Sequence, residues 1–375
     1  MLNRRTLRIK IMQTLFAYEQ CKEANYLLSR DFIEDKFKPD LNSMEVQDKS
    51  VLNTKKRDSL GLFEKLFQGE EVSTNGDVGA AAREALSKYQ SQTKKDFDFL
   101  KKNMVAEVEQ LNASYHSILT LIVALANVAR SEKKSGLTCL INHPIIKAIS
   151  ENDELRRESL KENSTWDNRM DKVRTWFRDV VKSDKALAQF EAAHDSEVET
   201  QKAILKHMVR KLILGDTIIN DHFEEENIRW SEDRDVLKSL VEKTIKSFDS
   251  DAGTIGLQKL SLDWQDDKLF MDKMFSSAAD IDPYYKDLIA RNTRNWEVDR
   301  LPLTDRVILE MAIAELTGFP GIPVKVSINE YIELAKHYST PKSRQFINGI
   351  LDVIAKELKG EGKIKKSGKG LLDNK

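Results

Sequence analysis

The sequence has few of the residues that interrupt helices. Its 375 residues include only 7 prolines and 15 glycines, and runs rich in Lys, Glu, Leu and Ala fill the intervals between them. These residue types have high helix propensity, whereas strands favour β-branched and aromatic residues. The composition therefore predicts an all-α protein. The length allows two domains, or one domain with large insertions.

Cysteine is nearly absent, and no apolar run is long enough for a membrane span. Cys21 and Cys139 lie far apart, which argues against a disulfide framework and favours a reducing cytoplasm. The most apolar run, residues 118–129, is shorter than the roughly 20 residues that cross a bilayer. No signal peptide pattern is visible. We therefore expect a cytoplasmic protein without a membrane partner, in which this run forms a buried core helix.

Motifs for catalysis and metal binding are also missing. None of the six histidines is followed by a histidine or cysteine three or four positions later, which makes a metal site improbable. The sequence has no glycine-rich phosphate loop, no serine nucleophile elbow and no activated cysteine. Paired carboxylates occur only in patterns typical of a solvated helix surface. We predict no enzymatic activity, no metal and no cofactor.

Charge is balanced overall but unevenly distributed. The formal net charge is −1, although the first 22 residues hold five basic residues against one acidic residue. The segment from Glu361 to the end holds five lysines against two acidic residues. Since a basic patch can be balanced by acid elsewhere, the overall charge does not exclude nucleic acid.

The N-terminal segment combines an apolar helical stripe with a basic start. The stripe consists of Leu7, Ile11, Leu15 and Tyr18. Arg4, Arg5 and Arg8 fall in the first two turns, where cations oppose the helix dipole by a few tenths of a kcal/mol each. Helix stability therefore does not select them, whereas contact with phosphate would. The alternative that they only keep an exposed terminus soluble remains open.

The middle of the chain is expected to be helical after an irregular insertion. Residues 37–79 lack a sustained apolar period and predict a flexible insertion with one short helix at 62–67. Residues 80–130 predict one long helix, or two in line, from apolar residues at spacings of three and four. His143-Pro144 ends that pattern, and further helices are expected up to residue 248, the last of them capped by Ser231.

Residues 300–358 predict three helices. The first runs from Asp305 to about Thr317 with Thr304 as its N-cap, and it is apolar around most of its girth, as expected of the central helix of a bundle. The second has Ile328, Ile332 and Ala335 as its buried stripe. The third is expected to start at Thr340-Pro341 and to bury Phe346, Ile350, Ile354 and Leu358.

Polar residues make this C-terminal segment specific. The sequences Ile322-Pro-Val-Lys-Val-Ser-Ile-Asn-Glu330 and Phe346-Ile-Asn-Gly-Ile-Leu-Asp352 contain polar positions that a helical core does not require, and Ile332-Glu-Leu-Ala-Lys336 lies between them. Together they resemble the NusB family of transcription antitermination proteins. The resemblance is close over residues 266–358. It resumes in the first twenty residues through Arg4-Arg5 and Gln13-Thr-Leu-Phe-Ala-Tyr18.

The resemblance implies a NusB-like helical bundle of two packed subdomains, with additional long helices inserted in the N-terminal half. On this basis we expect a basic N-terminal helix in residues 1–30 and a helical region with the insertion in 31–260. The C-terminal bundle would occupy 261–360, and 361–375 would be a disordered basic tail.

The resemblance also implies RNA binding. NusB proteins bind the boxA element of RNA through an arginine-rich start and the C-terminal bundle. The positions of this chain that match those regions are Arg4, Arg5, Arg8, Lys10, Lys325, Arg344, Gln345 and Phe346. The apolar stripe favours a core position for Phe346, and Asn348 with Gly349 would allow close packing between helices.

A protein partner follows from the same resemblance. NusB proteins bind a small-subunit ribosomal protein that doubles as the elongation factor NusE, and they act with RNA polymerase in the antitermination complex. The matching positions here are Asp305, Tyr338 and Lys342. Lys342 stands where many members have an acidic residue, and Glu310 replaces a frequent arginine. These departures predict either a lost partner contact or a partner surface of altered charge.

Two alternative functions are consistent with a helical protein of this kind. A related helical module precedes the catalytic domain of some ribosomal RNA cytosine methyltransferases, but this sequence shows no segment for a cofactor-binding sheet. A non-catalytic helical scaffold without an RNA role is the second alternative. The predicted function is RNA binding in transcription antitermination.

Overall fold

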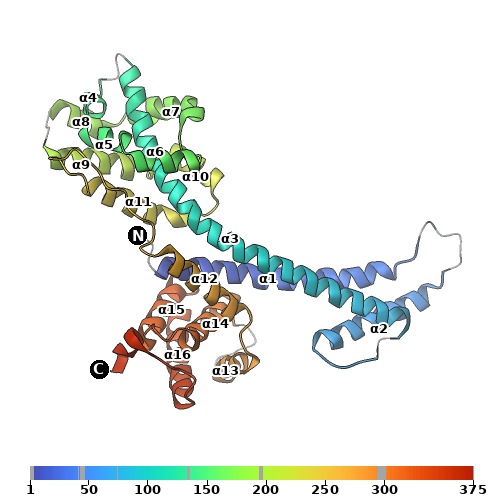
Figure 1. Cartoon of the computed structure of the whole chain (residues 1–375). Coiled ribbons are helices and arrows are strands. Elements are labelled where there is room, and N and C mark those ends of the chain that lie inside the picture. The colour runs from blue at the N-terminus through green and yellow to red at the C-terminus, as the bar shows by residue number, and fades with distance from the viewer. Residues whose placement is uncertain are drawn as a thin grey trace. The chain divides into compact units, whose positions relative to one another are not determined.

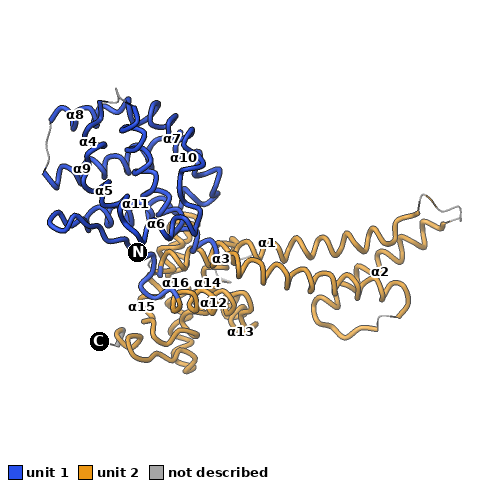
Figure 2. Tube along the Cα trace, turned by 45° about the horizontal axis from the view of Figure 1, so that its top comes forward, with its two compact units in different colours: residues 1–4, 106–264 blue, residues 5–105, 265–375 orange. Residues whose placement is uncertain are grey.

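The computed structural model describes residues 4–40, 42, 47–73, 75–132, 136–193, 197–293 and 301–374, and these contain helices but no strand (Figure 1). This agrees with the predicted all-α class. The chain divides into two compact units, coloured separately in Figure 2. Unit 1 comprises residues 1–4 and 106–264, and unit 2 comprises residues 5–105 and 265–375.

The helices of unit 2 come from both ends of the chain. They are α1 (Arg4–Lys36, without its first residue), α2 (Lys49–Phe67), the first part of α3 (Gly76–Ser131), α12 (Trp264–Ala279, without its first residue), α13 (Pro283–Thr293), α14 (Leu303–Gly318), α15 (Val324–Tyr338), α16 (Ser343–Gly360) and the 3-10 turn η5 (Gly368–Asn374).

The central helix of unit 2 is α14. Every residue from Val307 to Leu316 is buried, including Glu310 and Glu315, because α13, α15 and α16 all pack on α14. The predicted central position of this helix is confirmed. The stripe Leu7, Ile11, Leu15 and Tyr18 of α1 is buried as well. Tyr18 packs edge-on against Phe97 of α3 and Phe275 of α12, which joins the N-terminal helix to the rest of the unit.

Residues 37–79 contain a regular helix where a flexible insertion was expected. Helix α2 starts after Asp48, whose carboxylate accepts hydrogen bonds from the backbone N–H groups of Ser50 and Val51. It buries Phe63 in a small cluster with α1 and α3. The other buried members of that cluster are Ile33, Phe37, Ala81, Ala82 and Ala85. The expected short helix at 62–67 is only the last part of a 19-residue helix, so the prediction of an irregular insertion was wrong.

Helix α3 confirms the long helix predicted for residues 80–130. Its predicted stripe is fully buried, from Met104 and Val108 to Ile122 and Leu125. By length and composition one 18-residue stretch of α3 could cross a membrane, but 72% of that stretch is buried inside the protein. A buried apolar helix is what the core of a helical domain requires.

Unit 1 surrounds the second part of α3 with shorter helices. They are α4 (Thr138–Ile141), α5 (Pro144–Ser150), α6 (Asp153–Lys161), the 3-10 turn η1 (Asp167–Arg169), α7 (Met170–Trp176), the π-helical turn η2 (Phe177–Val181), α8 (Lys185–Ala193), α9 (Val198–His207), the π-helical turn η3 (Met208–Ile213), α10 (Thr217–Glu226) and α11 (Trp230–Lys246). The Tyr115 hydroxyl on α3 hydrogen-bonds Thr244 Oγ1 on α11 and accepts from the backbone N–H of Gln258. Arg229 precedes α11 in the cap position, so the predicted cap at Ser231 was wrong.

The units do not follow the expected linear order of segments. The region predicted as 31–260 is shared between both units, and α1 together with residues up to 105 belongs with the C-terminal bundle. The basic tail is also more ordered than expected. Lys366 Nζ donates to the carbonyl of Phe319 at 3.0 Å, the Ser367 N–H donates to the carbonyl of Pro320, and η5 follows.

Candidate nucleic-acid interface

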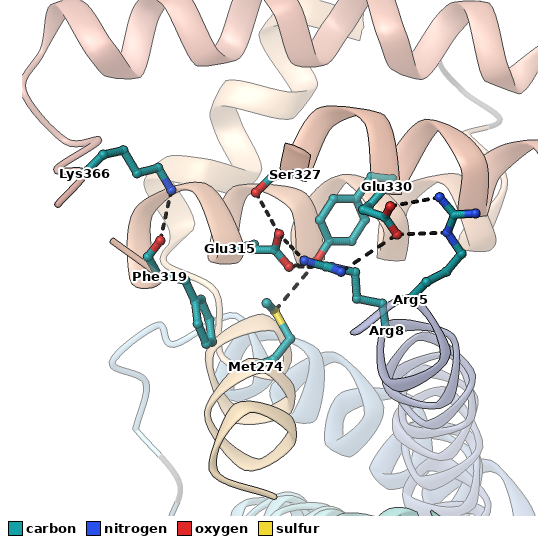
Figure 3. A network of polar contacts seen from close by, with 9 residues as sticks. Arg5, Arg8, Met274, Glu315, Phe319, Ser327, Glu330 and Lys366 are labelled. Carbon is teal, nitrogen blue, oxygen red and sulfur yellow. Dashed lines mark hydrogen bonds and ion pairs between the residues drawn. The ribbon is translucent and has the colours of Figure 1, made fainter. Parts of the chain in front are cut away.

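A buried ion pair fixes α1 to the centre of the C-terminal bundle. Arg8 of α1 donates from Nε and Nη2 to the two carboxylate oxygens of Glu315 on α14, at 2.7 and 2.8 Å (Figure 3). Both side chains are almost inaccessible, with 3% of Arg8 and none of Glu315 exposed. A paired, bidentate geometry is the condition under which such charges can be buried.

The carboxylate of Glu315 has further donors on α15. The hydroxyls of Ser327 and Tyr331 donate to it at 2.7 and 3.0 Å, so its two oxygens accept four hydrogen bonds (Figure 3). Burial alone would lower the pKa of Arg8, but the hydrogen bonds and negative charge of Glu315 outweigh that effect and raise it. Arg8 is therefore a permanent cation that holds three helices together.

The neighbouring pair lies at the surface of unit 2. Arg5 donates from Nε and Nη2 to the carboxylate of Glu330 on α15, at 2.9 and 2.8 Å (Figure 3). The hydrogen bond from Arg5 lowers the pKa of Glu330 against the opposing effect of burial, so this carboxylate stays ionised. Because 43% of the Arg5 side chain remains exposed, this arginine can face a ligand while Glu330 holds it.

These contacts correct the reasoning about the N-terminal cations. From the sequence, helix stability gives no reason for the arginines, but Arg5 and Arg8 each have a carboxylate partner more than 300 positions away. Arg8 and Lys10 are 2% and 1% exposed, so neither can reach a ligand at the surface in this conformation. Arg5 is the arginine of the predicted set on α1 whose side chain is partly exposed within unit 2. Arg4 is half-buried and belongs to unit 1.

Arg5 contacts helix α15 through Glu330, and Lys325 is a residue of the same helix. Glu330, which binds Arg5, and Lys325 are five residues apart on α15, and Lys325 is exposed. Five residues turn a helix by about 140°. Arg5 and Lys325 therefore flank the exposed strip of α15 from opposite sides and do not line one narrow cleft.

The first turns of α16 carry the rest of the predicted RNA-binding set. Arg344 and Gln345 are exposed, and Phe346 is half-buried at the edge of a stripe centred on Ile347, so the prediction that Phe346 lies in the core is wrong in part. Nothing lies within 4 Å of a Cβ built on Gly349, and that residue is exposed. The predicted close helix approach at Gly349 is therefore absent.

Both predicted threonine caps differ from the structure. Helix α14 begins at Leu303, directly after Pro302, so Thr304 lies inside its first turn. Helix α16 begins at Ser343, and Thr340 instead hydrogen-bonds the Ser343 hydroxyl at 2.8 Å. Pro302 occupies the N-cap position of α14, and no side chain caps that helix.

The predicted partner-binding residues have different exposures. Asp305 is 2% exposed, and it accepts a hydrogen bond from the Ser343 hydroxyl at 2.7 Å, which ties the start of α14 to the start of α16. Lys342 is exposed and Tyr338 is half-buried at the end of α15. Glu310, further along α14, is buried, and burial raises the pKa of its carboxyl. Among the described residues no group of histidine, cysteine, aspartate or glutamate side chains could hold a metal ion.

Comparisons with known proteins agree with the C-terminal motifs. A family model described as the NusB family matches residues 235–356. The transcription antitermination protein NusB of Salinibacter ruber is 34% identical over 138 residues, which cover 36% of this chain and 86% of that protein. Its counterpart in Chloroherpeton thalassium is 44% identical over 103 residues, covering 28% and 47%. That of Koribacter versatilis is 47% identical over 78 residues, covering 21% and 53%.

The chain therefore spans about half the length of two of these three relatives. Among solved structures, T. maritima NusB matches with 28% sequence identity and a TM-score of 0.21, covering 42% of this chain and 91% of that one.

Proposed function

Because this chain belongs to the NusB family, we propose that it is an RNA-binding transcription antitermination factor that recognises boxA-like single-stranded RNA. The observation that carries the proposal is the Arg5–Glu330 ion pair, which sets the basic start of α1 on the helix that also bears Lys325. Both ends of the sequence thereby contribute cations to one compact unit.

Phosphate contacts would supply most of the affinity. Single-stranded RNA is held by cations that track the backbone. Each phosphate contact adds to the affinity and makes the affinity fall more steeply as the salt concentration rises. Arg5 and Lys325 would contact phosphates on the two sides of α15. The N-terminus of α16 carries the positive end of a helix dipole, with the exposed Lys342 and Arg344 beside it, and this arrangement favours a further phosphate.

Base contacts would come from the exposed face of α16. Gln345 and Asn348 are exposed there, and their amide groups can donate to and accept from base edges. The half-buried Phe346 leaves part of its ring beside them, where an unpaired base can stack. Arg8 acts indirectly in this scheme, because it anchors α1 through Glu315 and so positions Arg5.

The second part of the proposal is a complex with the small-subunit ribosomal protein NusE, within the antitermination complex on RNA polymerase. Lys342 and Tyr338 are the accessible candidates for that contact. The buried Asp305 would support it by holding Ser343, and with it the loop before α16, in place. A basic Lys342 calls for an acidic residue on the partner surface.

Fluorescence anisotropy with a labelled boxA-like oligonucleotide tests the proposal, with and without the ribosomal protein. We expect saturable, salt-dependent binding that tightens when the ribosomal protein is added. A scrambled oligonucleotide of equal length and composition should bind at least tenfold more weakly. Equal affinity for both oligonucleotides would contradict specific recognition, and no effect of the ribosomal protein would contradict the partner.

A further inference from the structure

Residues 88–102 of α3 form a basic stretch that the proposed RNA-binding site does not use. Nine of these residues are exposed: four lysines, two glutamines, one serine, one aspartate and one phenylalanine. The exposed side chains therefore carry a formal charge of +3, from four lysines against one aspartate. The stretch belongs to unit 2 and lies outside the residues that the NusB family model matches.

Two phenylalanines in this stretch point in different directions. The ring of Phe97 packs inward, 5.5 Å from that of Tyr18 on α1 and 5.1 Å from that of Phe275 on α12. Phe99 is two positions further along, a rotation of about 200° around the helix. It is 66% exposed, more than any other phenylalanine in the described part of the chain. Packing in the core therefore explains Phe97 but does not explain Phe99.

Lysines flank Phe99 on the same face of α3. Lys95 lies four positions before it and Lys102 three positions after it, and both spacings place side chains side by side on a helix. Both lysines are exposed, and neither has an ion-pair partner among the described residues. Gln92 adds an exposed amide about one turn before Lys95. These four residues, Gln92, Lys95, Phe99 and Lys102, are called the α3 ridge below.

The α3 ridge stands on a fixed support. Asn25 of α1 donates to one carboxylate oxygen of Asp96 at 2.7 Å, and Gln92 donates to the other at 2.9 Å. Lys101 lies 2.8 Å from Asp272 on α12. Because α1 and α12 occupy two sides of α3, the ridge presents its side chains to solvent on the remaining side. A surface that is already in place loses little conformational entropy when a ligand binds.

Single-stranded RNA has the chemistry that this ridge fits. Lysines contact phosphates, and an exposed aromatic ring stacks on an unpaired base of any type, because every base has a flat face. The bases of a duplex stack on one another and do not offer that face to a protein. A docked protein helix would require several apolar anchors at helical spacing, and the ridge has one apolar side chain between charged and polar ones.

We propose that the α3 ridge is a second contact for single-stranded RNA, in which Phe99 stacks on an unpaired base while Lys95 and Lys102 contact the neighbouring phosphates. This contact rests on the proposed RNA-binding function and extends it. Tyr18, which packs beside the ridge on Phe97, is thirteen positions from Arg5 on α1, or about 20 Å along that helix. RNA held at Arg5 reaches Phe99 only when it continues beyond the boxA-like segment.

Anisotropy titrations of the full chain test the contact with three labelled oligonucleotides. One is the boxA-like core alone, and the others carry a tract of about ten uridines at its 5′ or 3′ end, a length within the range of known single-strand binding sites. We expect one of the extended oligonucleotides to bind at least fivefold more tightly than the core.

The test variant is Lys95→Gln/Lys102→Gln, which should abolish this gain and leave the affinity for the core within twofold of wild type. It should also lower the salt slope of the extended oligonucleotide by about 1.4, because each phosphate contact on a single strand contributes about 0.7. The matched control, Lys49→Gln/Lys65→Gln, removes the same charge from exposed positions of α2 and should keep the gain. Unchanged thermal melting shows that the variants are folded.

Substitutions of Phe99 separate base stacking from other apolar contacts. Phe99→Tyr keeps an aromatic ring and should keep the gain, whereas Phe99→Leu keeps only apolar volume and should lose at least threefold of it. A core that binds without any gain on extension would overturn this contact alone, and failure of the core to bind would overturn the proposed function with it. A gain that survives Lys95→Gln/Lys102→Gln or Phe99→Leu would also overturn the contact.

Discussion

Arg8 and Glu315 lie 307 positions apart in the sequence and form a bidentate ion pair in the interior of unit 2. The first helix of the chain is thereby joined to the central helix of the C-terminal bundle. Removing one member of a buried pair leaves an uncompensated charge, whereas removing both leaves none. The contribution of this pair can therefore be measured by comparing single and double substitutions.

Arg8→Met should lower the free energy of unfolding by about 3–5 kcal/mol, because Glu315 would remain buried without its cation. The double substitution Arg8→Met/Glu315→Leu should recover a substantial part of that loss. Recovery should be incomplete, since the hydroxyls of Ser327 and Tyr331 lose their acceptor. Urea unfolding followed by circular dichroism measures both values. Additive losses in the double variant would show that the pair is not coupled.

Arg5→Ala should weaken binding of the boxA-like oligonucleotide and lower the salt slope by about one ion, because one phosphate contact is lost. The control is Arg57→Ala on α2, which removes an exposed arginine that lies beside Asp58. That control should leave both quantities unchanged. Anisotropy titrations at several salt concentrations give the slopes, and equal effects of the two substitutions would remove Arg5 from the interface.

Acidification should destabilise unit 1 through His143. Burial lowers the pKa of this residue from 6.5 to about 4, although its Nε2 donates to the carbonyl of Gln201. Its Nδ1 caps α5 by accepting from the N–H of Ile146, and protonation would abolish that role. The unfolded chain therefore takes up the proton first. Stability present above pH 6.5 should fall by about 3 kcal/mol between pH 6.5 and pH 4.

The variant His143→Asn serves as the control, since asparagine can cap a helix but does not titrate. The difference in unfolding free energy between wild type and this variant should shrink as pH falls through that window. Parallel pH profiles for the two proteins would contradict a neutral, buried His143.

Glu310→Gln should stabilise the protein at neutral pH. Burial raises the pKa of Glu310, so the folded protein binds this proton more tightly than the unfolded chain does. Stability is therefore lost as the pH rises above the pKa of the unfolded chain, which is about 4.5. The amide removes that cost while it keeps the shape of the side chain. Melting temperatures of the two proteins should be similar at pH 4 and should diverge toward pH 8. A variant that is less stable at pH 8 would show that Glu310 has a favourable ionic role.

The periodicity of apolar residues in the sequence was sufficient to predict the helices that have a regular buried face. The stripes of α1 and α3 and the all-round burial of α14 are regular patterns of apolar residues, and the structure confirms them. Only the last part of helix α2 was predicted, because the helix buries little apolar surface of its own, chiefly Phe63. Its start was nevertheless marked by Asp48, whose side chain caps it.

The polar contacts of the site could be predicted only in part. The exposed positions of Lys325, Arg344 and Gln345 agree with a surface role. The pairing of Arg5 and Arg8 with glutamates on α15 and α14 has no local signature, since each pair spans more than 300 residues. One signal was available: Glu315 lies in the apolar stretch Val307–Leu316 of α14, and a carboxylate buried there must either pair with a cation or shift its pKa.

Cross-linking with 4-thiouridine in a boxA-like oligonucleotide tests the shared RNA-binding surface most directly. After ultraviolet irradiation and digestion, mass spectrometry identifies the peptides bound to RNA. We predict cross-links both to the start of α1 around Arg5 and to the segment from Lys342 to Phe346, and both should disappear when unlabelled RNA competes. Cross-links confined to residues 106–264, or to only one of the two segments, would contradict the account.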